Sequence, residues 1–67
     1  MKITNKWLVD NKTKNGGYTK LQLSLIGIPW PPIHGWKKNV IGKEISNDKK
    51  QAFEFVSQMT KTGEIDV

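Results

Sequence analysis

The chain has 67 residues, no cysteine, and a formal net charge of +5, in which eleven lysines and no arginine oppose six acidic residues. This length allows one domain with a small core, spanning residues 1–67, and the missing cysteines exclude disulfides and thiolate metal sites. No apolar run approaches the ~20 residues of a membrane span, and the first residues lack the apolar core of a signal peptide. We therefore expect a cytoplasmic protein that does not associate with membranes.

Two segments near the N-terminus have the spacing of a hydrophobic staple, in which an apolar residue precedes a threonine N-cap and a leucine follows it by four. The caps are Thr4 and Thr19, and Gln22 completes a capping box after the second. These signals predict helices over residues 5–12 and 20–26, the second closed by a glycine at position 27.

The same region also fits a β-hairpin. Apolar and polar residues alternate over 19–25, and Asn15-Gly16 is a typical hairpin turn. We favour the helices because of the caps and the terminating glycine, and keep the hairpin as the alternative.

Residues 28–35 form a stiff connector, because Pro29, Pro31 and Pro32 fix their own backbone and push the preceding residues to extended conformations. Residues 39–45 are then predicted as a short strand, with Gly42 as a bulge or bend.

A last helix is predicted over residues 48–59, capped by Ser46 or Asn47, with Phe53, Val56 and Met59 at helical spacing. Residues 60–67 are expected to be a frayed tail. The expected class is a small α+β domain: two short helices or a hairpin, a Pro- and Trp-rich extended connector, a short strand and a C-terminal helix.

The tryptophans of the connector are expected to stabilise this small scaffold. Trp30 and Trp36 are predicted to pack as a central layer against Phe53 and Val56, since a short chain needs its large apolar side chains inside. Pro-Trp-Pro-Pro also has the composition of a polyproline recognition sequence, although such ligands usually lie in disordered tails.

We expect no enzyme, no cofactor and no metal site. His34 is the only histidine; it has no acidic residue within five positions and no serine beside it, whereas a catalytic triad needs partners in defined roles. The acidic residues show no paired-carboxylate or metal-ligand spacing, and the glycines do not match a phosphate-binding loop.

The charge is unevenly distributed along the chain. Residues 1–43 contain eight lysines and one acid, Asp10, whereas residues 44–67 contain three lysines and five acids. This asymmetry favours polyanions or acidic protein surfaces as partners, although a solvated lysine surface has the same composition. Because arginine is the preferred bidentate reader of guanine and phosphate, a lysine-only protein is suited to backbone contacts more than to base readout.

Candidate binding residues gather after the connector. Trp36, Lys37, Lys38 and the nearby Lys43 combine an aromatic ring that can stack on bases with charges that can meet phosphates. Lys20 lies in the first turn of the second helix of a helix-turn-helix-like pair, where recognition helices contact DNA. The predicted binding site is Lys20, His34, Trp36, Lys37, Lys38 and Lys43.

A threonine-capped helix followed by Gly27-Ile28, by Trp30-Pro-Pro, by Gly35-Trp-Lys-Lys and by Ile41-Gly-Lys-Glu-Ile-Ser resembles small accessory proteins of phages and mobile elements. This resemblance implies no catalytic residues. We expect a small non-catalytic basic protein that binds nucleic acid with low sequence specificity. The alternative is a phage-type protein-binding inhibitor or modulator that docks on an acidic or nucleic-acid-binding surface of a host enzyme or defence complex. DNA, RNA and protein all stay open as partners, as does the oligomeric state.

Overall fold

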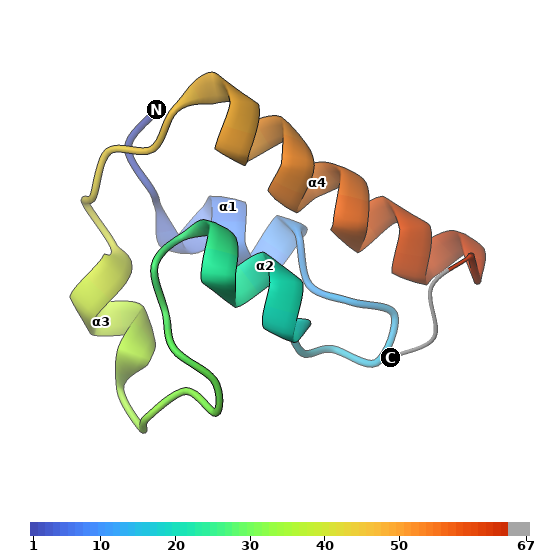
Figure 1. Ribbon diagram of the computed structural model, residues 1–67, viewed down its shortest axis with the longest axis horizontal. Coiled ribbons are helices and arrows are strands. Elements are labelled where there is room, and N and C mark those ends of the chain that lie inside the picture. Colours follow the sequence, from blue (N-terminus) through green and yellow to red (C-terminus); the bar gives the residue numbers. More distant parts are fainter. Residues whose placement is uncertain (65–67) are drawn as a thin grey trace.

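A computed structural model of the chain describes residues 1–64. Within them lie four helices: α1 (Asn5–Asp10), α2 (Lys20–Leu25), α3 (Trp36–Val40) and α4 (Asn47–Thr62). Helix α4 is the longest element and runs across the molecule, with α1 and α2 packed along it, whereas α3 and the connector before it lie to one side (Figure 1). No helix in the described part of the chain is both long and apolar enough to span a membrane.

The predicted α+β class is wrong, because the described residues form helices without a sheet. The error lies in residues 39–45, which we predicted as a strand. Trp36–Val40 instead form α3, which begins after Gly35 at φ 84°, and Gly42 at φ 93° turns the chain behind it. Two glycines in the left-handed region, seven positions apart, bracket a helical turn more readily than they bracket a strand.

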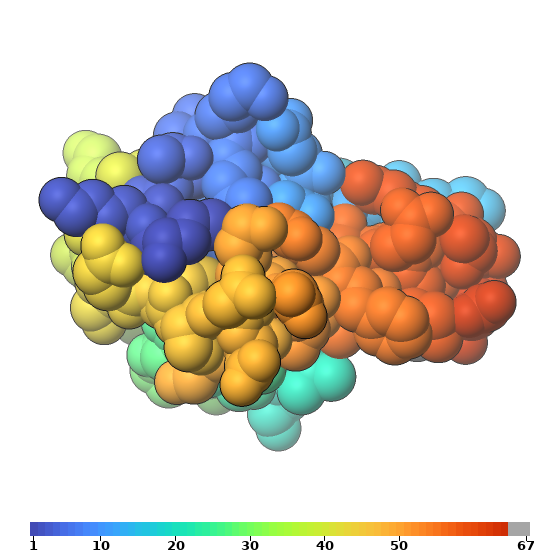
Figure 2. Space-filling view, turned by 90° about the horizontal axis from the view of Figure 1, so that it is seen from above, coloured from blue at the N-terminus to red at the C-terminus, as the bar shows by residue number. Residues whose placement is uncertain are grey.

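Among residues 1–64, β-type pairing is limited to one isolated antiparallel bridge between Lys2 and Glu44. The N–H of Ile3 donates to the carbonyl of Lys43 at 2.9 Å, and the carbonyl of Ile3 accepts from the N–H of Gly42 at 2.8 Å. Figure 2 shows the first residues lying against the segment before α4. This pairing cannot extend into a sheet, because Thr4 already caps α1.

The two N-terminal helices and their caps are confirmed, which excludes the hairpin. The hydroxyl of Thr4 accepts from the N–H of Trp7 at 3.1 Å. In α2, the hydroxyl of Thr19 accepts from the N–H of Gln22 at 3.0 Å, and the side-chain oxygen of Gln22 accepts from the N–H of Thr19 at 2.9 Å. These bonds satisfy donors that a helix start would otherwise leave unpaired.

Helix α2 ends as predicted at a glycine. Gly27 adopts φ 81°, its N–H donates to the carbonyl of Ser24, and the N–H of Ile28 donates to the carbonyl of Leu23 at 2.9 Å. This is the Schellman pattern, which needs a left-handed residue and therefore favours glycine. It folds the start of the connector back onto α2.

The core lies between α1, α2 and α4 and centres on Phe53, which is fully buried. The ring of Trp7 packs on Phe53 with centroids 4.5 Å apart, and its indole N–H donates to a carboxylate oxygen of Glu54 at 2.8 Å. The prediction that Trp30 and Trp36 form the central layer is therefore wrong for Trp30, whereas Trp36 is partly buried and packs against the core without being its centre. The other buried apolar residues are Ile3, Leu8, Leu23, Ile26, Val40 and Val56.

The buried side of α4 is partly polar. The hydroxyl of Ser57 donates to the carbonyl of Lys12 at 2.8 Å, and the hydroxyl of Thr60 accepts from the N–H of Lys14 at 3.2 Å. Both hydroxyls hold the loop between α1 and α2, whose backbone would otherwise lack partners at this interface. Helix α4 starts after Ser46, one of the two predicted caps, and continues through Thr62 instead of ending at Met59, so residues 60–62 of the expected tail are helical. Residues 65–67 of that tail lie outside the described residues.

Candidate nucleic-acid interface

Four of the six predicted binding residues lie together in one open groove. His34, Trp36, Lys37 and Lys38 line a depression of about 460 Å³, together with Pro32 and Ile33. We call this depression the α3 groove. The connector is not extended throughout as predicted, because it bends at Trp30 and Pro31, where the peptide bond is cis. The left-handed Gly35 then caps α3 directly, so consecutive residues of the connector and α3 line the depression.

The other two predicted residues are not part of this groove. Lys20 lies in the first turn of α2, and Lys43 follows α3, where its carbonyl is bound by the N-terminal segment. Gln22 is fully buried, so the first turn of α2 does not offer its amide to a ligand as a recognition helix would.

Trp36 and Lys37 are held by Tyr18. The rings of Trp36 and Tyr18 meet edge to face with centroids 5.3 Å apart. The ammonium of Lys37 lies 5.5 Å from the centre of the Tyr18 ring and 6.0 Å from that of Trp36. Tyr18 is fixed in turn by its hydroxyl, which donates to the carbonyl of Leu8 at 2.8 Å, and burial raises the pKa of this phenol. The positive charge at the groove therefore has a defined position, with cation–π attraction in place of a salt bridge.

Three carboxylates in residues 1–64 form ion pairs away from the groove. Asp10 pairs with Lys6 at 2.8 Å, and Glu44 pairs with the N-terminal ammonium at 3.2 Å. Glu54 pairs with Lys50 at 3.0 Å, and its pKa is lowered by the hydrogen bond from the indole of Trp7 and by that lysine, against the effect of burial.

Residues 11–43, which we call the acid-free segment, contain six lysines and not a single aspartate or glutamate. This segment comprises the loop after α1, all of α2, the connector and α3. Within the described residues, none of its lysines has a carboxylate partner. The charge of the segment is therefore uncompensated and available to an anionic ligand.

No protein-family model, curated protein or solved structure matches the chain.

The groove presents ammonium, imidazole, indole and proline side chains. His34 is exposed, and in residues 1–64 no three histidine, aspartate or glutamate side chains lie close enough together to hold a metal ion. Ammonium groups beside aromatic and proline surfaces can hold phosphates and cover the apolar edges of a ligand.

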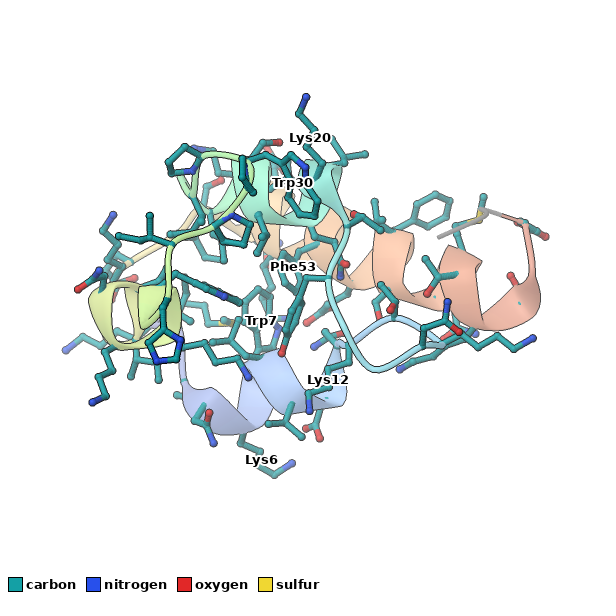
Figure 3. All side chains as sticks on the ribbon, turned by 90° about the horizontal axis from the view of Figure 1, so that it is seen from below. Lys6, Trp7, Lys12, Lys20, Trp30 and Phe53 are labelled. Carbon is teal, nitrogen blue, oxygen red and sulfur yellow. The ribbon has the colours of Figure 1, made fainter. Side chains whose placement is uncertain are left out.

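Trp30 is a surface residue that the sequence interpretation placed in the core. Its side chain is 49% exposed, and it has no hydrogen-bond or ring partner among the described residues. Figure 3 shows Trp30 on the same side of the molecule as Lys20, whereas Lys6 lies on the opposite side.

Proposed function

We propose that this chain is a small non-catalytic protein that binds the phosphate backbone of nucleic acids with little sequence preference. The observation that carries the proposal is the acid-free segment, whose six lysines have no carboxylate partner among the described residues. Phosphate is the ligand that such a surface suits, because each ammonium that meets a phosphate displaces counterions from the nucleic acid.

Low specificity follows from the side chains available. Lysine offers a point charge, and the chain has no arginine for bidentate contacts with guanine. The α3 groove lies on a helix of five residues, which is too short to present a row of side chains to base edges along a major groove. We therefore expect contacts with the backbone and affinities that depend little on sequence.

Salt dependence provides the test. If Lys37, Lys38 and Lys43 each neutralise one phosphate of a mixed-sequence duplex, the slope of log K against log salt is about −3, with roughly micromolar or weaker affinity at physiological salt. The double variant Lys37→Ala/Lys38→Ala should flatten that slope by about 2 and weaken binding to all sequences alike. Fluorescence anisotropy over a salt series measures both quantities.

The matched control is Lys49→Ala/Lys61→Ala, which removes the same charge from two exposed positions on α4. It should leave the slope unchanged if the acid-free segment is the binding surface. Thermal melts of both variants check folding, because Lys37 also contacts Tyr18. If the Lys37→Ala/Lys38→Ala protein binds DNA like the wild type at every salt concentration, the α3 groove is not the binding site.

Exposed apolar side chains favour a second candidate, a protein-binding inhibitor or modulator. Leu21 is 55% exposed and Ile33 is 67% exposed, and both belong to the acid-free segment. Apolar side chains ringed by lysines suit an acidic protein surface. A pull-down after nuclease treatment separates the two: one stoichiometric protein partner supports this candidate, whereas length-dependent binding to mixed oligonucleotides supports the first.

A further inference from the structure

The three tryptophans of the chain differ in what they do for the fold. Trp7 packs on Phe53 and donates to Glu54, and Trp36 packs against Tyr18. Trp30 does neither, and it lies outside the hydrophobic core. A large aromatic ring that has no hydrogen-bond or ring partner and is left half in water is a feature typical of binding surfaces.

The backbone presents Trp30 in a rigid way. Proline precedes and follows it, which fixes the neighbouring φ angles. The connector is also anchored at both ends, by the hydrogen bond from Ile28 to Leu23 and by one of 3.2 Å from the N–H of Trp36 to the carbonyl of Ile33. Because little conformational freedom is left to lose, a ligand that covers this ring incurs a small entropic cost.

The charge on the side of the molecule where the Trp30 ring lies indicates which ligand the ring suits. Lys20 is exposed, has no carboxylate partner among the described residues, and lies on the same side of the molecule as Trp30 (Figure 3). Helix α2, which separates the two in sequence, has six residues and is therefore only about 9 Å long. In the other direction the connector runs directly from Trp30 into the α3 groove through Pro32 and Ile33.

We propose that Trp30 stacks on an unpaired base while Lys20 and the lysines of the α3 groove hold the phosphates on either side of it, so that the protein prefers single-stranded to duplex nucleic acid. The inference rests on the proposed backbone binding and adds the class of ligand. A lysine-flanked aromatic ring is the combination that single-strand-binding surfaces use, because every base has a face that can stack. A base inside a duplex is already stacked and cannot reach the ring.

The test compares a mixed-sequence single strand with a hairpin duplex that has the same number of phosphates. One stacked base contributes roughly 5- to 150-fold in affinity. We expect the wild type to prefer the single strand by a factor in this range, and Trp30→Ala to bind both probes with the duplex affinity. Trp30→Phe should keep part of the preference. Lys20→Ala should lower the salt slope on the single strand by about 0.7.

Phe55→Ala is the control for loss of an exposed aromatic ring, since Phe55 is 62% exposed on α4. It should keep the wild-type preference. Equal wild-type affinity for both probes, or a preference that survives Trp30→Ala, overturns the inference while duplex binding still upholds the proposed function. If the protein binds neither probe, both the inference and the proposed function are overturned. If the pull-down then recovers a stoichiometric protein partner that Trp30→Ala no longer binds, the ring belongs to a protein interface.

Discussion

The side chain of Gln22 provides the sharpest test of how this small domain is held together. It is fully buried, and its oxygen accepts from the N–H of Thr19 at 2.9 Å. Its amide nitrogen donates to the carbonyl of Asn11 at 3.0 Å and approaches the carbonyl of Phe53 at 3.5 Å. One amide therefore joins the end of α1, the start of α2 and the middle of α4.

The substitution Gln22→Glu replaces the side-chain NH₂ group, which donates to the carbonyl of Asn11, with an oxygen. The remaining oxygen still accepts from Thr19, but a carboxylate would place a second oxygen against the carbonyl of Asn11. Protonation restores a donor there, so the buried site favours the protonated acid and raises its pKa. Holding that proton at about pH 7 costs up to about 3.7 kcal/mol, because the unfolded side chain titrates near 4.3 and each pH unit is about 1.36 kcal/mol.

The same cost falls to about 0.5 kcal/mol at about pH 4.5, so acid should rescue the variant. Domains of this length have roughly 3–10 kcal/mol of stability, which makes the loss at neutral pH large. The direction of the pH dependence follows from linkage. Because the pKa of the introduced glutamic acid is higher in the folded state than in the unfolded state, the variant is most stable below the unfolded pKa and loses stability as the pH rises above it.

Urea denaturation of wild type and variant at both pH values measures the difference, and comparing them at the same pH cancels the titration of other groups. Gln22→Met is the control, because it fills a similar volume but lacks both hydrogen bonds at any pH. Its loss of stability should not depend on pH. If Gln22→Glu and Gln22→Met are destabilised equally at both pH values, the amide does not bridge Thr19 and Asn11 as described.

Two further predictions concern the neighbours of this amide. Phe53→Ala should lower the free energy of unfolding by roughly 3–5 kcal/mol, because Phe53 is fully buried against Trp7, and a melting temperature within a few degrees of wild type would contradict the core assignment. The pKa of Glu54 is lowered by its hydrogen bond from Trp7 and by Lys50, so its stabilisation is present above the unfolded value of about 4.3 and is lost as the pH falls below it. Thermal melts from about pH 6 to about pH 3 should therefore show a smaller loss for Glu54→Gln than for wild type.

The sequence predicts the starts of α1, α2 and α4 and the end of α2 because these are decided locally, whereas α1 ends at Asp10 before its predicted end and α4 continues to Thr62 beyond its predicted end. A threonine cap, a capping-box glutamine and a terminating glycine act within four or five residues of one another. Thr4, Thr19 and Ser46 all cap helices, and Gly27 closes α2 as expected. No contact from a distant segment is needed to define these boundaries.

The prediction of a strand over residues 39–45 is wrong because a strand forms only where a second strand lies beside it. The apolar pattern there fits a strand as well as a helical turn, and only the short N-terminal segment lies close enough to pair with it. Gly35 and Gly42 were both visible in the sequence, but either can mark a bulge or a left-handed helix boundary. Which role applies depends on the φ angles of 84° and 93° that the fold imposes.

The tryptophans were misassigned for a related reason. Composition demands that some large rings be buried, but it does not say which. Trp7 reaches Phe53 across 46 positions of sequence, a contact that only the packing of α1 on α4 brings about. The burial of polar residues on α4 could not be predicted from the sequence either. Ser57 and Thr60 form hydrogen bonds with the backbone of Lys12 and Lys14, and these residues are distant in the sequence.

The spatial sorting of charge links the fold to the proposed function. Asp10, Glu44 and Glu54 form their ion pairs with groups outside the acid-free segment, on or beside α1 and α4. Asp48 lies in the first turn of α4, where a negative charge is favourable. Exposed ion pairs contribute little stability, so their larger effect is on the field around the molecule: they neutralise one side and leave the lysines around α2 and α3 unopposed. Lys20 and Lys38 are exposed, so replacing either should weaken binding with little change in melting temperature, whereas Trp36 and Lys37 also contact Tyr18.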